Sequence, residues 1–191
     1  MSGSTAFDHE RVRNAIRELL IGLGENPDEP RLQQTPRRIA ESWREFYASS
    51  AAAIHPLPQI IEESNDLVVV RNIDFVSVCE HHLLPFAGVV HVAYQPQRTL
   101  LGLSDIPRLV RRASSRLQLQ EGLTRDIATD FQTETAAQGV VVVMEARHGC
   151  VSDRGIRQAR VRATTVAALG TLESASSQAA ILGMVVGSRE S

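Results

Sequence analysis

The sequence predicts an α+β fold in which a helical N-terminal arm precedes a domain built on a β-sheet. Three observations lead to this class. Residues 12–46 place apolar side chains at helical spacing, whereas residues 67–94 and 140–146 are rich in β-branched residues. Between those strand regions, residues 104–131 return to helical spacing. Grouped strands followed by helices are typical of the α+β class.

The arm is expected to contain two amphipathic helices. The first covers residues 12–20, where apolar side chains recur every three or four positions. The second begins at Thr35 and Pro36, an N-cap residue followed by proline at the first helical position. It places Trp43 and Phe46 on one face, which must cover an apolar surface such as that of another subunit.

A hinge is expected between the arm and the rest of the chain. Residues 51–58 are mostly small and contain two prolines. The predicted parts are therefore a helical arm over residues 1–58 and a second domain over residues 59–191.

The second domain is expected to open with two paired strands, residues 67–78 and 86–94, on either side of a turn that begins at Cys79. The remaining expected elements are two helices, two strands and a weakly helical tail, over residues 104–110, 120–131, 140–146, 154–166 and 174–186. The helix that follows Ser104 presents free backbone N–H groups at its start, which makes it a candidate anion site.

Composition narrows the classes of partner and the location. At 191 residues the chain is long enough for one core of ordinary size. Its net charge of −2 lacks the basic excess expected of a nucleic-acid-binding protein. No apolar stretch approaches the ~20 residues that cross a bilayer, and the first ten residues lack the basic start and apolar segment of a secretory signal. We therefore expect a cytoplasmic protein with neither nucleic-acid nor membrane partners.

Both cysteines of the chain lie close to histidines, each at the end of a predicted strand. Cys79 and His82 form a C-x-x-H pair, and Cys150 follows later in the chain. Thiolate and imidazole are ligands that zinc prefers, and a set of three protein ligands leaves a fourth position open for catalysis. His81 and His148 are then two further imidazoles that can move protons for a metal-activated water. This pattern is typical of a metal-assisted hydrolase.

Other interpretations of the same residues remain open at this point. The two cysteines can be inert buried thiols, and the adjacent histidines can be polar residues at strand ends. The cysteines can also pair as a disulfide, although the absence of a secretory signal favours a reducing compartment.

Several longer motifs resemble the GTP cyclohydrolase I family. In order along the chain they read TPRRIAESW, VCEHHLLPFAGVVHVAYQP, GLSDIPRLV, SSRLQLQEGLT and GVVVVMEARHGCVSDRGIR. Together they extend from about residue 11 to residue 165. The resemblance implies a tunnelling fold, in which antiparallel strands from several subunits close a barrel with helices outside. It also implies a tunnelling-fold catalytic domain over residues 59–191 and a homodecamer of two pentameric rings with active sites at subunit junctions.

The resemblance also implies a reaction and a metal site. Family members convert the purine nucleotide GTP and water into 7,8-dihydroneopterin triphosphate and formate, the first step towards folate and related pterins. By resemblance, Cys79, His82 and Cys150 bind Zn²⁺, and the activated water attacks C8 of guanine. His81 and His148 match the family's proton-transfer histidines.

The resemblance assigns the substrate-binding residues as well. Glu121, with Gln120, matches the pair that recognises guanine, and Ser104 matches a catalytic residue near the ribose and phosphates. The full substrate-binding set implied in this way is Leu103, Ser104, Arg108, Gln120, Glu121 and Arg154. The two arginines match those that bind the triphosphate, because a planar guanidinium suits phosphate oxygens.

The chain departs from the family at the phosphate end. Asp105 and Gln158 stand where lysine is usual, and Val161 stands where serine is usual. All 20 basic residues here are arginine, so a genome that avoids lysine would be expected to supply arginine at these positions. The departures leave two alternatives to a GTP-specific enzyme: a relative that acts on a guanine nucleotide with fewer phosphates or on another purine, and a non-catalytic zinc-bearing scaffold or regulatory oligomer. Retention of both histidines and Glu121 favours an enzyme.

Overall fold

The chain divides into two compact units, residues 1–52 and 53–191. The computed structural model describes residues 7–51, 59–61, 66–97 and 99–186. The hinge expected over residues 51–58 lies, except for its first residue, outside the described residues. Within the described ranges, no helix combines the length and the apolar character needed to cross a membrane.

The N-terminal unit consists of two helices that pack against each other, α1 (His9–Gly22) and α2 (Thr35–Ala51). α1 begins after Asp8, whose carboxylate accepts a hydrogen bond from a backbone N–H of the first turn at 2.9 Å. On α2, the rings of Trp43 and Phe46 meet edge to face with centroids 5.8 Å apart. Both helices predicted for the arm are therefore present.

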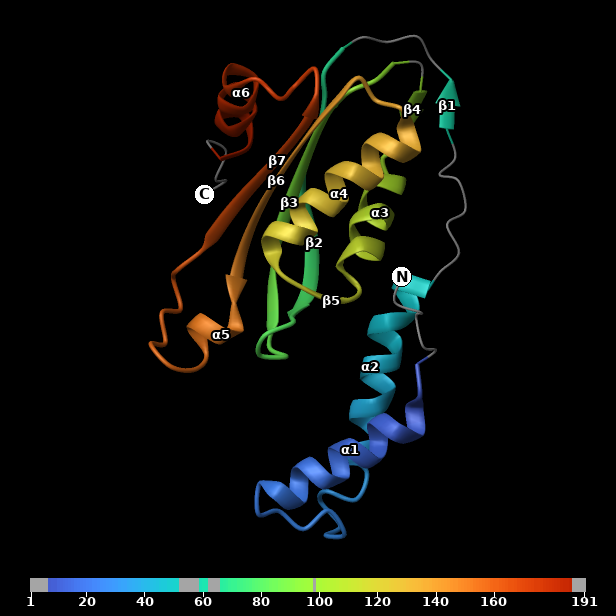
Figure 1. The fold of residues 1–191 in the computed structure, drawn as a ribbon, viewed down its shortest axis with the longest axis vertical. Coiled ribbons are helices and arrows are strands. Elements are labelled where there is room, and N and C mark those ends of the chain that lie inside the picture. The colour runs from blue at the N-terminus through green and yellow to red at the C-terminus, as the bar shows by residue number, and fades with distance from the viewer. Residues whose placement is uncertain (1–6, 52–58, 62–65, 98, 187–191) are drawn as a thin grey trace. The chain divides into compact units, whose positions relative to one another are not determined.

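The second unit is built on a five-stranded sheet with the order β5-β2-β3-β6-β7 (Figure 1). Its strands are β2 (Val68–Cys79), β3 (Pro85–Gln95), β5 (Leu117–Gln118), β6 (Gly139–His148) and β7 (Ala163–Gly170). All neighbouring pairs are antiparallel except β2 with β5. Two short strands, β1 (Gln59–Ile61) and β4 (Thr99–Leu101), form a separate antiparallel pair.

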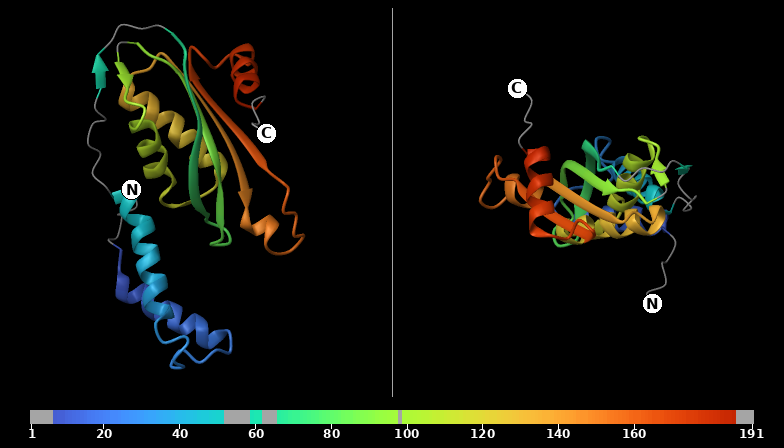
Figure 2. Two further views of the ribbon diagram at one scale, coloured as in Figure 1. Left: turned by 180° about the vertical axis from the view of Figure 1, so that it is seen from behind. Right: turned by 90° about the horizontal axis from the view of Figure 1, so that it is seen from above.

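Two helices, α3 (Asp105–Ser114) and α4 (Gln120–Thr135), cover one face of this sheet (Figures 1 and 2). The valine-rich strand β6 is buried on both of its faces because successive side chains point to opposite sides. Its even-numbered residues join the core beneath α3 and α4, whereas Val141 and Val143 pack with Ile181 on the other side. That residue belongs to α6 (Ala175–Val186), a helix that covers part of the opposite face. The predicted α+β sheet with its main helices on one face is confirmed.

The strand expected over residues 154–166 is shorter than the sequence pattern suggests. β7 begins only at residue 163, and residues 153–162 form exposed turns after the short helix α5 (Gly149–Ser152). Gly155 and Arg157 adopt positive φ angles of 57° and 48°, which a regular strand does not accommodate. The arginine-rich residues 154–162 therefore belong to exposed turns and not to a strand.

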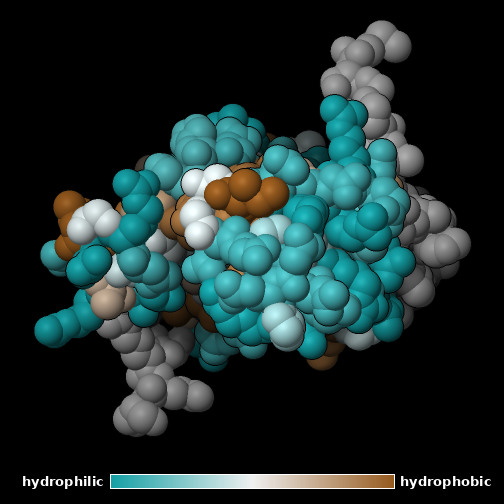
Figure 3. Space-filling model, turned by 90° about the horizontal axis from the view of Figure 1, so that it is seen from below, coloured by the Kyte–Doolittle hydropathy of each residue, from teal (hydrophilic) through white to brown (hydrophobic). Residues whose placement is uncertain are grey.

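The surface seen from below is mainly hydrophilic, and its hydrophobic areas are small and separate (Figure 3). Leu103 and Ile156 are the most exposed of the large apolar side chains described, each at 72%. Both lie in loops of the second unit, one before α3 and the other after α5.

A β-bulge interrupts β2 and involves a buried histidine of β3. The pairing register shifts between Val70 and Ile73, where Asn72 adopts a φ of 59°. The backbone N–H of Asn72 donates to Nδ1 of His91 at 3.2 Å, so this nitrogen must be unprotonated. Burial lowers the pKa of His91, the charge of Arg71 lowers it further, and Glu145 opposes these effects.

This arrangement predicts a loss of stability in mild acid. A histidine with a lowered folded-state pKa contributes stability that is fully present above its ordinary pKa of about 6.5 and is lost as the pH falls through the folded value. In His91→Asn, the amide oxygen supplies an acceptor near the Nδ1 position without titrating. Denaturant unfolding at about pH 7.5 and about pH 5 should therefore show a larger loss in the wild type than in His91→Asn. An equal loss in both proteins would contradict this assignment.

Candidate metal centre and active site

The candidate site lies where the ends of three elements meet. β2 ends at Cys79, and the following turn is closed by two backbone hydrogen bonds of 2.9 Å, from Cys79 N–H to Leu84 C=O and from Leu83 N–H to Cys79 C=O. In the antiparallel register of β3 and β6, Phe86 pairs with His148, so β6 ends beside this turn. α4 begins directly after β5, which pairs with the last residues of β2. The fold thus gathers residues far apart in sequence at one end of the sheet.

The predicted metal ligands come together at this end. Ligand atoms of Cys79, His82 and Cys150 (the Cys–His–Cys cluster) all lie within 4.8 Å of one another. The Sγ atom of Cys79 lies 3.8 Å from Nδ1 of His82. Burial raises the pKa of the Cys150 thiol, and the neighbouring Cys79 raises it further, since two adjacent thiolates repel each other. A bound cation would relieve that repulsion, so the cluster suits a metal ion with a preference for sulfur and nitrogen.

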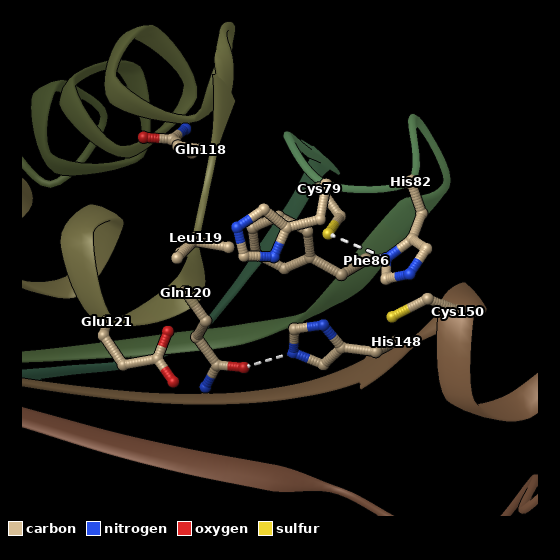
Figure 4. Close-up of a pocket in the computed structure, with 10 residues that line it drawn as sticks. Cys79, His82, Phe86, Gln118, Leu119, Gln120, Glu121, His148 and Cys150 are labelled. Carbon is tan, nitrogen blue, oxygen red and sulfur yellow. Dashed lines mark hydrogen bonds between the residues drawn. The ribbon is translucent and has the colours of Figure 1, made fainter.

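A pocket of about 270 Å³ opens beside the cluster (Figure 4). Its lining residues are Cys79, His81, His82, Phe86, Gln118, Leu119, Gln120, Glu121, His148 and Cys150. The structure therefore brings both extra histidines and the predicted guanine-recognising pair to the metal ligands. Phe86, Gln118 and Leu119 were not among the residues predicted from the sequence. Only their positions in the sequence could have indicated these three residues, because each lies within or beside a motif that supplies a predicted site residue.

His148 is held on two sides. Its ring stacks on Phe86 with centroids 4.9 Å apart and an angle of 2° between the planes. Its Nε2 atom lies 2.7 Å from Oε1 of Gln120. Burial lowers the pKa of His148, and the carboxylate of Glu121 opposes this effect. The imidazole therefore favours its neutral form in a fixed orientation.

Gln120 is the most deeply buried polar residue of the pocket, with 1% of its surface exposed. Its Nε2 atom lies near three acceptors, the carbonyl oxygens of Met144 (3.2 Å) and Ala163 (3.0 Å) and the hydroxyl of Thr165 (3.0 Å). Both ends of the amide are thus bound within the protein. Glu121, the next residue of α4, is exposed and is the only carboxylate among the lining residues.

The residues assigned to the phosphate end do not line this pocket. α3 has ten residues, so Ser104 at its start lies about 15 Å from the end that leads into β5 and the pocket. Leu103 precedes α3 and Arg108 is its fourth residue, and the Ser104 side chain makes no capping hydrogen bond. Arg154 is close enough to lower the pKa of Cys150 slightly, but it does not line the pocket either.

Asp105 is not turned toward solvent. Its side chain is only 5% exposed and accepts a hydrogen bond of 2.6 Å from Nη1 of Arg108, whose side chain is 69% exposed. The negative charge introduced at this position is therefore compensated within the first turn of α3.

The α+β fold brings a Cys–His–Cys cluster, two further histidines and a carboxylate to one pocket, a set of side chains that is typical of metal-dependent enzymes. The family model of GTP cyclohydrolase I matches residues 12–185, and the chain belongs to this family. Its domain accordingly has the tunnelling fold expected of members.

Relatives at the sequence level are similar over most of their length. GTP cyclohydrolase 1 of Leifsonia xyli is 41% identical over 186 residues, covering 95% of this chain and 97% of that protein. GTP cyclohydrolase 1 of Aquifex aeolicus is 44% identical over 154 residues, covering 79% and 82%. Among solved structures, the archaeosine synthase QueF-Like in the apo form is similar with a TM-score of 0.44 and 22% identity, covering 56% of this chain and 97% of that one.

The cluster predicts one bound metal ion per chain. Cys150→Ala removes one of the two thiolates and should leave the purified protein with little metal, because two remaining ligands bind weakly. His81→Ala is the matched control, since His81 lines the pocket but is not part of the cluster. Elemental analysis of both variants measures the difference. Full metal content in Cys150→Ala would exclude the cluster as the site.

Proposed function

We propose that this protein hydrolyses the imidazole ring of the guanine in GTP, giving 7,8-dihydroneopterin triphosphate and formate. The observation that carries the proposal is the pocket itself, which joins the Cys–His–Cys cluster to His81, His148 and Glu121 in a chain of the GTP cyclohydrolase I family. The product class makes this an entry reaction of pterin and folate synthesis, carried out in the cytoplasm.

Zinc is the metal that best fits the cluster. Two cysteines and one histidine supply the sulfur and nitrogen donors that zinc prefers, and a three-ligand set is typical of catalytic sites. When bound, Zn²⁺ supplies a Lewis acid that activates water near neutral pH. Cys79, His82 and Cys150 would hold it.

Glu121 is proposed to recognise guanine. One carboxylate can accept hydrogen bonds from the purine N1–H and the 2-amino group together, which is a bidentate match. Its position in the first turn of α4 places it at the pocket with its side chain exposed to an incoming ligand. Adenine has neither donor, so this contact selects guanine.

His148 and His81 are proposed to move protons. Addition of water at C8 and cleavage of the C8–N9 bond open the ring and leave a formamide on N7. A second water then cleaves the C8–N7 bond and releases formate, and one water is lost again when the new ring closes. N9 and N7 must therefore each gain protons. His148 favours the neutral form and directs one ring nitrogen into the pocket (Figure 4), where it can accept a proton and return it. His81 lies at the same pocket with a largely exposed side chain and can serve the second transfer.

We propose that the phosphate end of the site comes from a neighbouring subunit. Leu103, Ser104 and Arg108 do not line the pocket of their own chain, while Arg154 follows α5 near the cluster. Ser104 would then act near the ribose, with the two arginines on the phosphates.

The sheet supports such an assembly. β7 is an edge strand, and among the described residues β2 pairs on its outer side only through Val78 and Cys79. Two long open edges can pair between copies and close a barrel, which removes the exposed edges. The proposed assembly is the homodecamer expected for the family.

The test of this function is the release of formate from GTP by the zinc-loaded protein. We expect turnover of GTP and none of ATP, because ATP leaves the Glu121 carboxylate unpaired. Glu121→Gln should lower kcat/KM for GTP by about 10- to 100-fold, which corresponds to the roughly 1–3 kcal/mol lost when such a contact is removed. Asp126→Asn, on the same helix but away from the pocket, is the control. Equal turnover of GTP and ATP would contradict the assignment of Glu121.

A second candidate substrate is a guanine nucleotide with fewer phosphates. The observation that favours it is the Asp105–Arg108 ion pair, because it neutralises one of the two arginines proposed for the phosphates. In a comparison of GTP, GDP and GMP, this candidate predicts the highest kcat/KM for GMP. Asp105→Asn keeps the size of the side chain and frees the charge of Arg108, so it should raise kcat/KM for GTP several-fold and leave GMP unchanged. A wild-type preference for GTP with no effect of Asp105→Asn would exclude it.

A further inference from the structure

We infer that Gln120 is a positioning residue that fixes the tautomer and ring orientation of His148, so that the unprotonated Nδ1 atom faces the pocket. This inference rests on the proposed function for its kinetic consequence and on hydrogen-bond geometry for its structural content. It assigns the Gln120 side chain to the proton-transfer group and not to the nucleotide.

The orientation of the Gln120 amide is determined by its buried neighbours. The carbonyl oxygens of Met144 and Ala163 lie 3.2 and 3.0 Å from one end of the amide. Carbonyl oxygens only accept hydrogen bonds, so this end must be the NH₂ group. Because 1% of Gln120 is exposed, water does not compete for these positions.

A pair of threonines supports the same orientation. The hydroxyl of Thr124 donates to the backbone oxygen of Gln120 at 2.7 Å, so its hydrogen is committed. Thr124 and Thr165 hydroxyls are 2.6 Å apart, and Thr165 is therefore the donor between them. This leaves an oxygen lone pair of Thr165 to accept from Nε2 of Gln120 at 3.0 Å.

With the NH₂ group placed, the amide oxygen must be the atom that lies 2.7 Å from Nε2 of His148. An amide oxygen only accepts, so Nε2 of the imidazole carries the proton. The neutral ring then has its lone pair on Nδ1, the nitrogen that points into the pocket (Figure 4). Phe86, stacked flat on the ring at 4.9 Å, holds the plane in which this lone pair lies.

The residue after Gln120 links the orientation of His148 to the binding of the base. Glu121 follows Gln120 in the first turn of α4 and is proposed to bind guanine. One helical turn therefore sets both the position of the base and the direction of the proton acceptor. A flipped imidazole would present a C–H or N–H group to the nucleotide, and binding would continue without efficient proton transfer.

The kinetic test uses Gln120→Met, which has a similar length and no hydrogen-bonding groups, in the zinc-loaded full chain. We expect zinc content and the KM for GTP to stay close to wild type while kcat falls by about 10- to 100-fold, as for a misdirected catalytic group. Asp126→Asn is the control, because Asp126 lies on the same helix but makes no contact with Gln120 and does not line the pocket. An unchanged kcat in Gln120→Met, or an equal fall in Asp126→Asn, would overturn the positioning role.

A direct test needs no activity and no variant at position 120. Solid-state ¹⁵N spectra of the zinc-loaded protein, labelled at the histidine nitrogens, distinguish protonated from unprotonated ring nitrogens. The His148 signals are identified by their absence in His148→Gln. A proton on Nε2 supports the inference, and a proton on Nδ1 overturns it. Since this measurement is independent of turnover, it decides the inference even if GTP is not a substrate.

Discussion

The register of the central strand β3 is the constraint on which the site depends. β3 pairs with β2 on one side and β6 on the other, and its first residues set Phe86 opposite His148. A slip of one residue in either pairing would turn every side chain of a strand to the other face. The buried valines of β6 prevent such a slip, because each face of that strand packs against a different layer of helices. Packing far from the pocket therefore determines which side chains meet at the Cys–His–Cys cluster.

Much of this arrangement could be predicted from local sequence signals. Two cysteines, each close to a histidine at the end of a predicted strand, predict the Cys–His–Cys cluster. The spacing of apolar residues predicts the helices and the long strands. The strand predicted over residues 154–166 was wrong for residues 154–162, because the turns after α5 and their positive φ angles, such as that of Arg157, leave no signal in the composition. Gln120 and Asp105 show the same limit for side chains. Their residue types indicate polar binding roles, whereas their actual partners, Met144, Ala163 and Arg108, are set by tertiary packing.

The Asp105–Arg108 pair changes how the departure from the family is understood. An acid at the start of a helix is favourable there in its own right, because it complements the positive end of the helix dipole. With its carboxylate nearly buried, Asp105 also restrains the guanidinium of an otherwise exposed arginine. In this chain the position therefore contributes an ion pair at the start of α3 and no free positive charge. Its effect on a phosphate tail depends on the remaining N–H groups of Arg108 and on the turns that follow α5.

The first turn of α4 links two demands that are usually met by separate elements. Gln120 must be shielded from solvent, because water would compete for the hydrogen bonds of the amide that orients His148. Glu121 must instead be accessible to a ligand. Consecutive helical positions point about 100° apart, so one faces the sheet when the other faces the pocket. The Gln120 amide is bound to backbone carbonyls of β6 and β7, so the sheet orients the imidazole, whereas Glu121 is carried by the backbone of α4. Displacing α4 would therefore disturb base recognition and proton transfer together, which ties the specificity of the proposed reaction to its rate.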